Sequence, residues 1–116
     1  MLNTQSLIDL VQSTPEQVEF KSVIEVIDRD YDFTPSAFTN GEQQNQANEN
    51  NGSCKILAFA KLNQLTPEQS LQLFGDYYRV DVLQHPEAQD HQNIRQFMIH
   101  GWQGVSFTTS PLTLKA

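Results

Sequence analysis

The segment 54–65 (CKILAFAKLNQL) most constrains the fold, because apolar side chains occupy almost every face of the helix that it would form. A surface helix carries one apolar stripe, whereas a helix that is apolar all round needs neighbours on most sides. The segment therefore predicts a central helix. The chain has 116 residues, close to the commonest domain size and enough to enclose one core. We expect residues 1–116 to form a single domain around this helix.

The tetrapeptide TPEQ occurs twice, at residues 14–17 and 66–69, and both copies have the form of a helix start. Threonine at the N-cap accepts a hydrogen bond from a backbone amide of the first turn, and proline suits the first helical position. The glutamine side chain reaches back to the backbone amide of the cap residue. We expect the first copy to open a helix that runs to about Arg29. The second is expected to open a longer helix, in which Gly75 costs about 1 kcal/mol relative to alanine. Close approach of another backbone is the expected reason for this glycine.

Further elements complete the expected fold. A short amphipathic helix precedes the first TPEQ, and a last helix runs from about His91 to His100. Residues 32–39 and 103–115 alternate like strands, and we expect them to pair. The chain is therefore predicted to be a compact, helix-rich α+β domain with about five helices and a small β-sheet. Residues 42–53 (EQQNQANENNGS) contain no large apolar side chain, so we expect a mobile, solvated loop there.

The distribution of charge excludes two classes of partner. The net charge is −7, and the seven lysines and arginines are scattered along the chain. No basic stripe is available to neutralise phosphates, so neither nucleic acid nor an anionic membrane is an expected partner. The first residues, MLNTQSLIDLVQST, lack the basic and apolar regions of a Sec signal. The chain is therefore expected to be cytoplasmic, unless a route other than Sec exports it.

Residues 85–102 (HPEAQDHQNIRQFMIHGW) hold all three histidines of the chain and raise the question of a metal or catalytic site. In one helix, His91 and His100 would lie about 13 Å apart along the axis and about half a turn out of phase. They cannot share one metal ion, and His85 adds at most one ligand to either of them. No metal and no cofactor is expected here.

A structural role accounts for more of this stretch. Asp90 is expected to be the N-cap of the last helix, and Gly101 is expected to end it. Trp102 should pack back on the inward stripe of the helix. The expected members of this stripe are Ile94, Phe97 and Met98.

The same stretch allows an alternative, which is a polar patch that binds a ligand or a partner. Its members lie along the predicted helix and just beyond its end: His91, Arg95, His100 and Trp102. This alternative and the structural role stay open at the level of the sequence.

Cys54 is the single cysteine, so neither a disulfide framework nor a thiolate metal cluster is expected. A thiol at a helix N-terminus beside Lys55 can have a lowered pKa, and with His91 it would make a Cys-His hydrolase. No nucleophile signature surrounds Cys54, and its alternative role is that of a small buried residue in the central helix. We therefore expect a binding protein rather than an enzyme.

Three acids at the end of the first long helix, Asp28, Asp30 and Asp32, have the spacing of the first ligands of a calcium-binding EF-hand loop. The position that requires glycine is Phe33, and the position that requires glutamate is Thr39. Calcium is therefore not expected. A solvated acidic helix end is predicted instead, although acids there oppose the helix dipole.

Several blocks of sequence follow one another in a distinctive order: DFTPSAFTNG, GSCKILAFAKLNQL, LFGDYYR, DVLQHPE and DHQNIRQFMIHGWQGVSF. Together they resemble the HopJ type III effector family over nearly all of residues 14–115. The resemblance implies a compact, helix-rich α+β fold and a protein that a type III secretion system delivers into host cells. It implies no catalytic residue and no cofactor.

The leading hypothesis is a non-enzymatic, effector-class protein that binds a partner, which is a host protein if the chain is secreted. The second is a cytosolic housekeeping or stress-related protein that binds a small ligand and is never secreted. The third is a thiol hydrolase that uses Cys54. The oligomeric state is not predicted by any of them.

Overall fold

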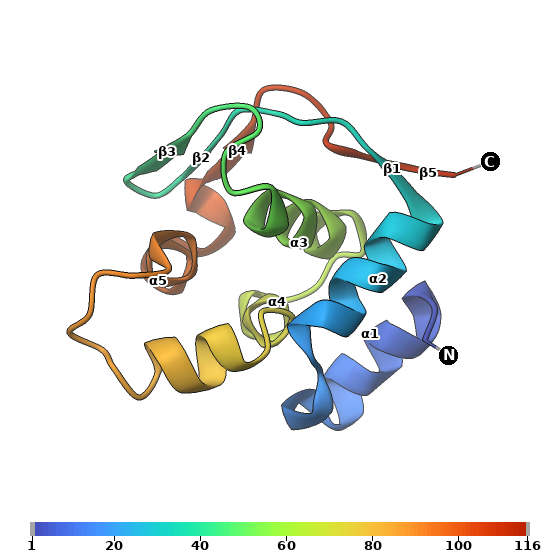
Figure 1. The fold of residues 1–116 in the computed structure, drawn as a ribbon, viewed down its shortest axis with the longest axis horizontal. Helices are drawn as coiled ribbons and strands as arrows, with labels where there is room; N and C mark the ends of the chain where they lie inside the picture. The colour runs from blue at the N-terminus through green and yellow to red at the C-terminus, as the bar shows by residue number, and fades with distance from the viewer. Residues whose placement is uncertain (1, 116) are drawn as a thin grey trace.

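The computed structural model describes residues 2–115 and confirms the predicted α+β class. Figure 1 shows the helices gathered below a layer of short strands. The α-helices are α1 (Thr4–Ser13), α2 (Phe20–Asp30), α3 (Asn51–Leu62), α4 (Pro67–Gln72) and α5 (Gln92–His100). The shorter helical segments are η1 (Pro15–Gln17), η2 (Tyr77–Val82) and η3 (Gly101–Gly104). The strands are β1 (Tyr31–Phe33), β2 (Phe38–Asn40), β3 (Gln43–Asn45), β4 (Val105–Phe107) and β5 (Leu112–Leu114).

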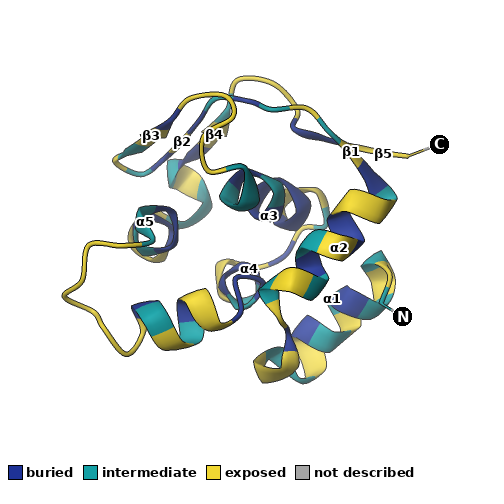
Figure 2. Ribbon diagram, viewed as in Figure 1, coloured by how far each residue is buried: buried dark blue, intermediate teal, exposed yellow. Residues whose placement is uncertain are grey.

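Helix α3 lies at the centre of the molecule, as its sequence predicts. Helices α2 and α4 and strand β5 pack against it, and the middle of its ribbon is dark blue in Figure 2. Ile56, Leu57, Phe59 and Ala60 on this helix are fully buried. Burial of each large apolar side chain stabilises the fold by about 1.5–3 kcal/mol, so α3 makes a substantial contribution to the core.

The strands form two small antiparallel sheets. Strand β1 pairs with β5, so that Phe33 lies opposite Leu112, and β2 lies between β3 and β4. In the second sheet Phe38 lies opposite Phe107, and their rings are 5.6 Å apart. The predicted pairing of residues 32–39 with the C-terminal segment is therefore confirmed.

The segment 42–53 differs from the expected loop. Residues 43–45 form strand β3, and helix α3 already begins at Asn51, so only residues 46–50 connect the two elements. Asn45 is buried in spite of its polar side chain. The physical reason is a set of amide hydrogen bonds to other parts of the chain, which is described with the candidate site below.

The two copies of TPEQ do not behave alike. In the second copy the backbone amide of Gln69 donates to Thr66 Oγ1 (3.1 Å), and the backbone amide of Thr66 donates to Gln69 Oε1 (3.0 Å). The predicted capping box is therefore confirmed. The first copy forms only η1, and the prediction of a helix starting there is wrong, because α2 begins at Phe20. The guanidinium of Arg79 donates to the carbonyl oxygens of Pro15 and Val18. In a continuous helix these oxygens would accept from backbone amides four residues further along the chain. A distant side chain thus overrides the local signal.

The predicted long helix after Thr66 is also wrong as a continuous element. Helix α4 ends at Gln72, and a π-helical segment, η2, follows after a break at Gly75. Gly75 has a φ of +61°, and a Cβ placed there would lie 2.8 Å from the backbone nitrogen of Phe20. The expected close approach of another backbone is therefore confirmed, and it also explains why the helix breaks there.

The acidic end of α2 has a structural partner. Thr4 donates from its amide and its hydroxyl to Asp30 Oδ2, at 3.2 and 2.8 Å. The hydrogen bond from Arg29, together with those from Thr4, lowers the pKa of Asp30. Asp30 therefore places negative charge at the N-terminus of α1, which offsets its unfavourable position at the end of α2. Asp28 pairs with Lys55 at 2.8 Å, and within residues 2–115 no cluster of histidine, cysteine and acidic side chains could hold a metal ion.

Helix length also bears on location. Within the part of the chain that the structure describes, no helix is both long enough and apolar enough to cross a membrane.

Gly75→Ala is expected to destabilise the protein by about 3 kcal/mol, because a Cβ at positive φ meets the backbone of α2. Urea denaturation followed by circular dichroism measures the loss. Gly52→Ala is the matched control: it lies in α3, and its Cβ would meet only the end of the Phe20 ring at 3.2 Å. Equal losses in the two variants would contradict the assigned role of Gly75.

Candidate functional site

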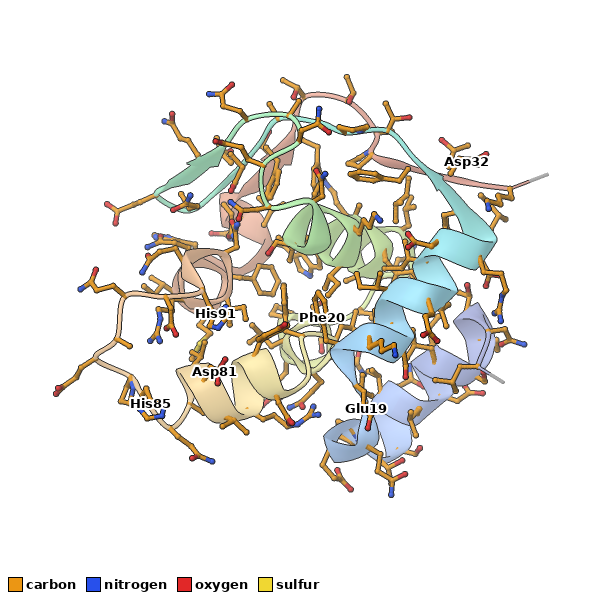
Figure 3. The ribbon with its side chains drawn as sticks, in the orientation of Figure 1. Glu19, Phe20, Asp32, Asp81, His85 and His91 are labelled. Carbon is orange, nitrogen blue, oxygen red and sulfur yellow. The ribbon has the colours of Figure 1, made fainter. Side chains whose placement is uncertain are left out.

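The start of α5 differs from the sequence prediction. His91, not Asp90, is the N-cap residue, and it has left-handed backbone angles with a φ of +52°. This conformation lets the His91 ring reach η2, where Nε2 lies 3.0 Å from Asp81 Oδ2. Figure 3 shows these two side chains facing each other, while His85 lies apart on the connecting loop. The prediction of Asp90 as N-cap is therefore wrong.

Arg95 fixes the loop that precedes α5. Its guanidinium donates to the carboxylate of Asp90 (2.6 Å) and to the carbonyl oxygens of Asp90 (2.6 Å) and Pro86 (3.3 Å). The hydrogen bond from Arg95 is the main cause of the lowered pKa of Asp90. The charge of Arg95 is thus satisfied within the chain.

The end of α5 follows the prediction closely. Gly101 has a φ of +60°, and the Trp102 ring packs edge-on against Phe97 at 4.9 Å. The Trp102 indole also donates to the Leu65 carbonyl oxygen at 3.1 Å. The prediction that Met98 points inward is wrong, because its side chain is 44% exposed.

The four residues of the sequence-predicted patch do not converge. His91 lies at the start of α5 beside Tyr77, with a ring separation of 5.1 Å. His100 lies at the other end of the helix, close to Gly41 and Gly104. Trp102 faces α4 and the end of α3, and Arg95 holds the loop. Of the four residues, His91 alone lines the cavity between α3, α5 and η2.

A buried cluster of amide side chains lies beneath α5, and sequence reasoning missed it. Asn93 is its hub: its Oδ1 accepts from Asn40 and from Asn45, at 3.1 Å each, and its Nδ2 donates to Asn45 Oδ1 at 3.0 Å. Asn50 adds a further bond to Asn45 at 2.6 Å. The sequence offered one signal for this cluster, which is the asparagine Asn93 among the inward-facing residues of α5. The cluster joins β2, β3, α5 and the start of α3.

A cavity of about 410 Å³, which we call the His91 pocket, lies between α3, α5 and η2. The first turns of α3 and α5 both open onto it, and neither helix has a side-chain cap or an acidic residue in its first turn. Helix N-termini carry partial positive charge and free amide groups. Phe20 and Tyr77 supply an apolar wall. The pocket suits a small polar or anionic molecule with a flat apolar part.

Cys54 does not take part in this pocket. Its side chain is 1% exposed, and its thiol lies 4.0 Å from the carbonyl oxygen of Ser36, to which it donates. Burial raises the pKa of the Cys54 thiol to about 11, so the thiolate required of a nucleophile is disfavoured near neutral pH. Cys54 and His91 have separate hydrogen-bond partners, and the proposed Cys-His pair does not form.

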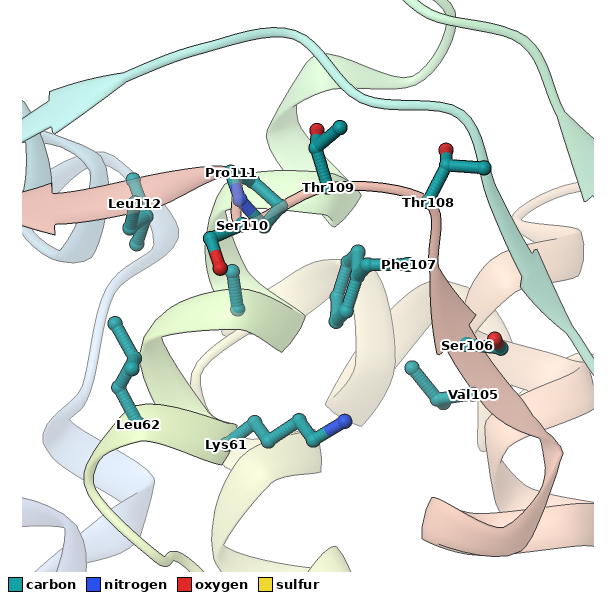
Figure 4. A pocket seen from close by; sticks show the side chains of 11 residues that line it. Lys61, Leu62, Val105, Ser106, Phe107, Thr108, Thr109, Ser110, Pro111 and Leu112 are labelled. Carbon is teal, nitrogen blue, oxygen red and sulfur yellow. The ribbon is translucent and has the colours of Figure 1, made fainter.

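A second cavity, of about 610 Å³, lies on the other side of α3 (Figure 4). We call it the α3–β4 groove: Ala58, Lys61 and Leu62 form one wall, strand β4 forms the other, and residues 108–112 border it. Leu62 contributes apolar surface to this groove, since its side chain is 56% exposed. The groove combines exposed apolar surface with strand backbone, which suits a protein or peptide partner.

Comparison with known proteins agrees with this fold. The model of the HopJ type III effector protein family matches residues 4–112. The chain belongs to this family. A crystal structure described as that of the unknown-function protein VPA0580 has a TM-score of 0.95 to this HopJ chain, with 58% identity over 96% of this chain and 92% of that one. No curated protein matches the chain.

The family resemblance stated from the sequence blocks is therefore confirmed. The family description supports an effector-like character for this HopJ protein, whereas the neighbouring structure carries no statement of activity.

Asn93→Ala is expected to destabilise the protein by about 2 kcal/mol, because it removes three hydrogen bonds and leaves buried amides of Asn40 and Asn45 with fewer partners. Gln92→Ala is the neighbouring control, since Gln92 only donates to Gln89 at the surface, and its loss should stay within about 0.5 kcal/mol. Urea denaturation measures both. A neutral Asn93→Ala variant would show that the cluster contributes nothing to stability.

The Cys54 thiol is expected to resist labelling in the native protein. Its burial and raised pKa predict that a thiol reagent such as DTNB reacts at least about a hundredfold more slowly at pH 7.5 than with urea-unfolded protein. Absorbance at the wavelength of the released chromophore follows the reaction. Rapid stoichiometric labelling without unfolding would reinstate Cys54 as a reactive residue.

Proposed function

We propose that this HopJ protein is an effector-class protein that acts by binding another protein, and that the α3–β4 groove is the contact surface. The observation that carries the proposal is the exposed side chain of Leu62 beside a large cavity and next to strand β4. Exposed apolar surface around a groove is typical of surfaces that bind proteins. The family description supports the effector class.

The surroundings of the reactive side chains support binding rather than catalysis. The Cys54 thiol donates to the Ser36 carbonyl oxygen, and His91 Nε2 lies 3.0 Å from Asp81 Oδ2 on η2. A nucleophile requires a base within hydrogen-bond distance, and neither residue offers this arrangement to the other. The third hypothesis, a thiol hydrolase, thereby loses its geometric basis.

A second candidate function rests on the His91 pocket. Two uncapped helix N-termini beside an aromatic wall favour a small anionic ligand, as expected of a cytosolic ligand-binding protein that is never secreted. The two functions differ in what they require. The first needs export and a partner protein, and the second needs neither.

Site-specific photo-crosslinking tests the first function. The full chain, carrying p-benzoyl-phenylalanine at the position of Leu62, is expressed in a bacterium with a type III secretion system during contact with host cells. We expect a covalent adduct with a host protein, because position 62 borders the groove. Position 83 is the matched control, since Leu83, directly after η2, is 48% exposed and does not line the groove.

Export is measured in the same experiment with a strain that lacks the secretion apparatus. Transfer of the chain only from the intact strain, with an adduct at 62 and none at 83, supports the proposal. Equal adducts at both positions, or no adduct at either, would overturn the groove as the contact surface. Retention of the chain in both strains would favour the cytosolic function instead.

A further inference from the structure

Strand β4 has one edge that no strand within residues 2–115 covers. It lies at the end of the sheet order β3-β2-β4. At the two ends of the pairing with β2, the Thr108 amide donates to the Ala37 carbonyl oxygen and the Gly41 amide donates to the Gly104 carbonyl oxygen. Hydrogen-bonded pairs alternate along an antiparallel ladder, so Ser106 exchanges both of its backbone hydrogen bonds with Thr39. The amide and carbonyl of Phe107 must then point away from β2.

This open edge faces the α3–β4 groove. In Figure 4, β2 lies on one side of β4, whereas Lys61 and Leu62 lie on the other, with the Phe107 ring between them and the strand. The cavity therefore lies beside the backbone groups of β4 that lack a strand partner. A strand edge in this position can accept one more strand through main-chain hydrogen bonds.

The charge of the groove distinguishes it from the rest of the surface. Lys61 is the one charged side chain among the residues that line it, although the protein carries a net charge of −7. Its ammonium group lies 5.7 Å from the centre of the Phe107 ring, and within residues 2–115 it forms no ion pair with an acid. A partner with a carboxylate at this point would complement the groove.

We propose that the α3–β4 groove binds an extended peptide segment of the partner as an added strand on β4. An acidic side chain of the peptide pairs with Lys61, and apolar side chains two residues before and after it, on the same face of the added strand, contact Leu62 and Phe107. This inference rests on the proposed function and specifies its partner.

A second copy of the chain fits this surface less well. Symmetric pairing through β4 would bring two identical walls together, each with its own Lys61, and two chains of charge −7 repel each other. A peptide with one glutamate brings no second Lys61, and that glutamate can pair with the Lys61 of the groove.

Fluorescence anisotropy with a labelled hexapeptide tests the proposal on the full chain. The peptide carries valine, glutamate and valine at alternate positions with serine between them, so that these three side chains share one face of the strand. Its ends are blocked, so that its one carboxylate is the glutamate side chain. Two analogues accompany it: one has glutamine in place of glutamate, and one is N-methylated on alternate backbone nitrogens. We expect binding to weaken about fivefold for the glutamine analogue and more than tenfold for the N-methylated one.

Protein variants identify the groups that the peptide contacts. Lys61→Gln should abolish the difference between the glutamate and glutamine peptides, which a merely structural role of Lys61 would leave unchanged. Phe107→Pro removes the outward amide of β4 while the Ser106 bonds to β2 remain, and Phe107→Val retains that amide. Phe107→Pro should bind at least fivefold more weakly than Phe107→Val, with both folded by circular dichroism.

The outcomes separate this inference from the proposed function. Binding that tolerates N-methylation, equal affinity of Phe107→Pro and Phe107→Val, or a charge effect that survives Lys61→Gln would each overturn strand addition. No peptide binding, together with a host-protein adduct at position 62, would reject the peptide mode while the protein-binding function stands. Dimer formation abolished by Phe107→Pro would assign the edge to a second copy of the chain.

Discussion

The burial of α3 on most of its faces is the constraint on which the rest of the structure depends. Its apolar positions must be covered by other elements, and α2, α4 and β5 supply that cover. Close approach also occurs among the covering elements, since the start of α2 lies against Gly75. The two ends of α3 remain outside the core. Its first turn borders the His91 pocket and its last turns border the α3–β4 groove, so one rigid helix supports both cavities.

The parts of the fold that could be predicted from the sequence are those that depend on local pattern and burial. The all-round apolar helix, the second capping box, the role of Gly75 and the pairing of the C-terminal segment all follow from residue types and spacing. The first TPEQ failed for a non-local reason, since Arg79 lies more than sixty residues away from the carbonyl groups that it binds. No window of sequence around residues 14–17 contains that information.

The candidate site was less predictable, because its parts come from distant segments. The histidine-rich stretch drew attention to titratable groups, yet its structural core is Asn93, which holds β2 and β3 to α5 through buried amides. An asparagine-rich segment is predicted to be a loop as long as the hydrogen-bond partners of its side chains are unknown. Here the partner of Asn45 is Asn93, about fifty residues away. The same amides displace Met98 from the inward face, since Asn93 and Gln96 occupy inward positions of α5.

The open edge of β4 acquires its meaning from these constraints. A strand edge with unpaired backbone groups is a liability for association, and natural proteins usually cover such edges or place charge beside them. Here Lys61 stands beside the edge, while the adjoining cavity and the exposed Leu62 leave room for another chain. An edge that is protected against indiscriminate pairing by one charge, but kept accessible, fits a surface that selects its partner by a carboxylate.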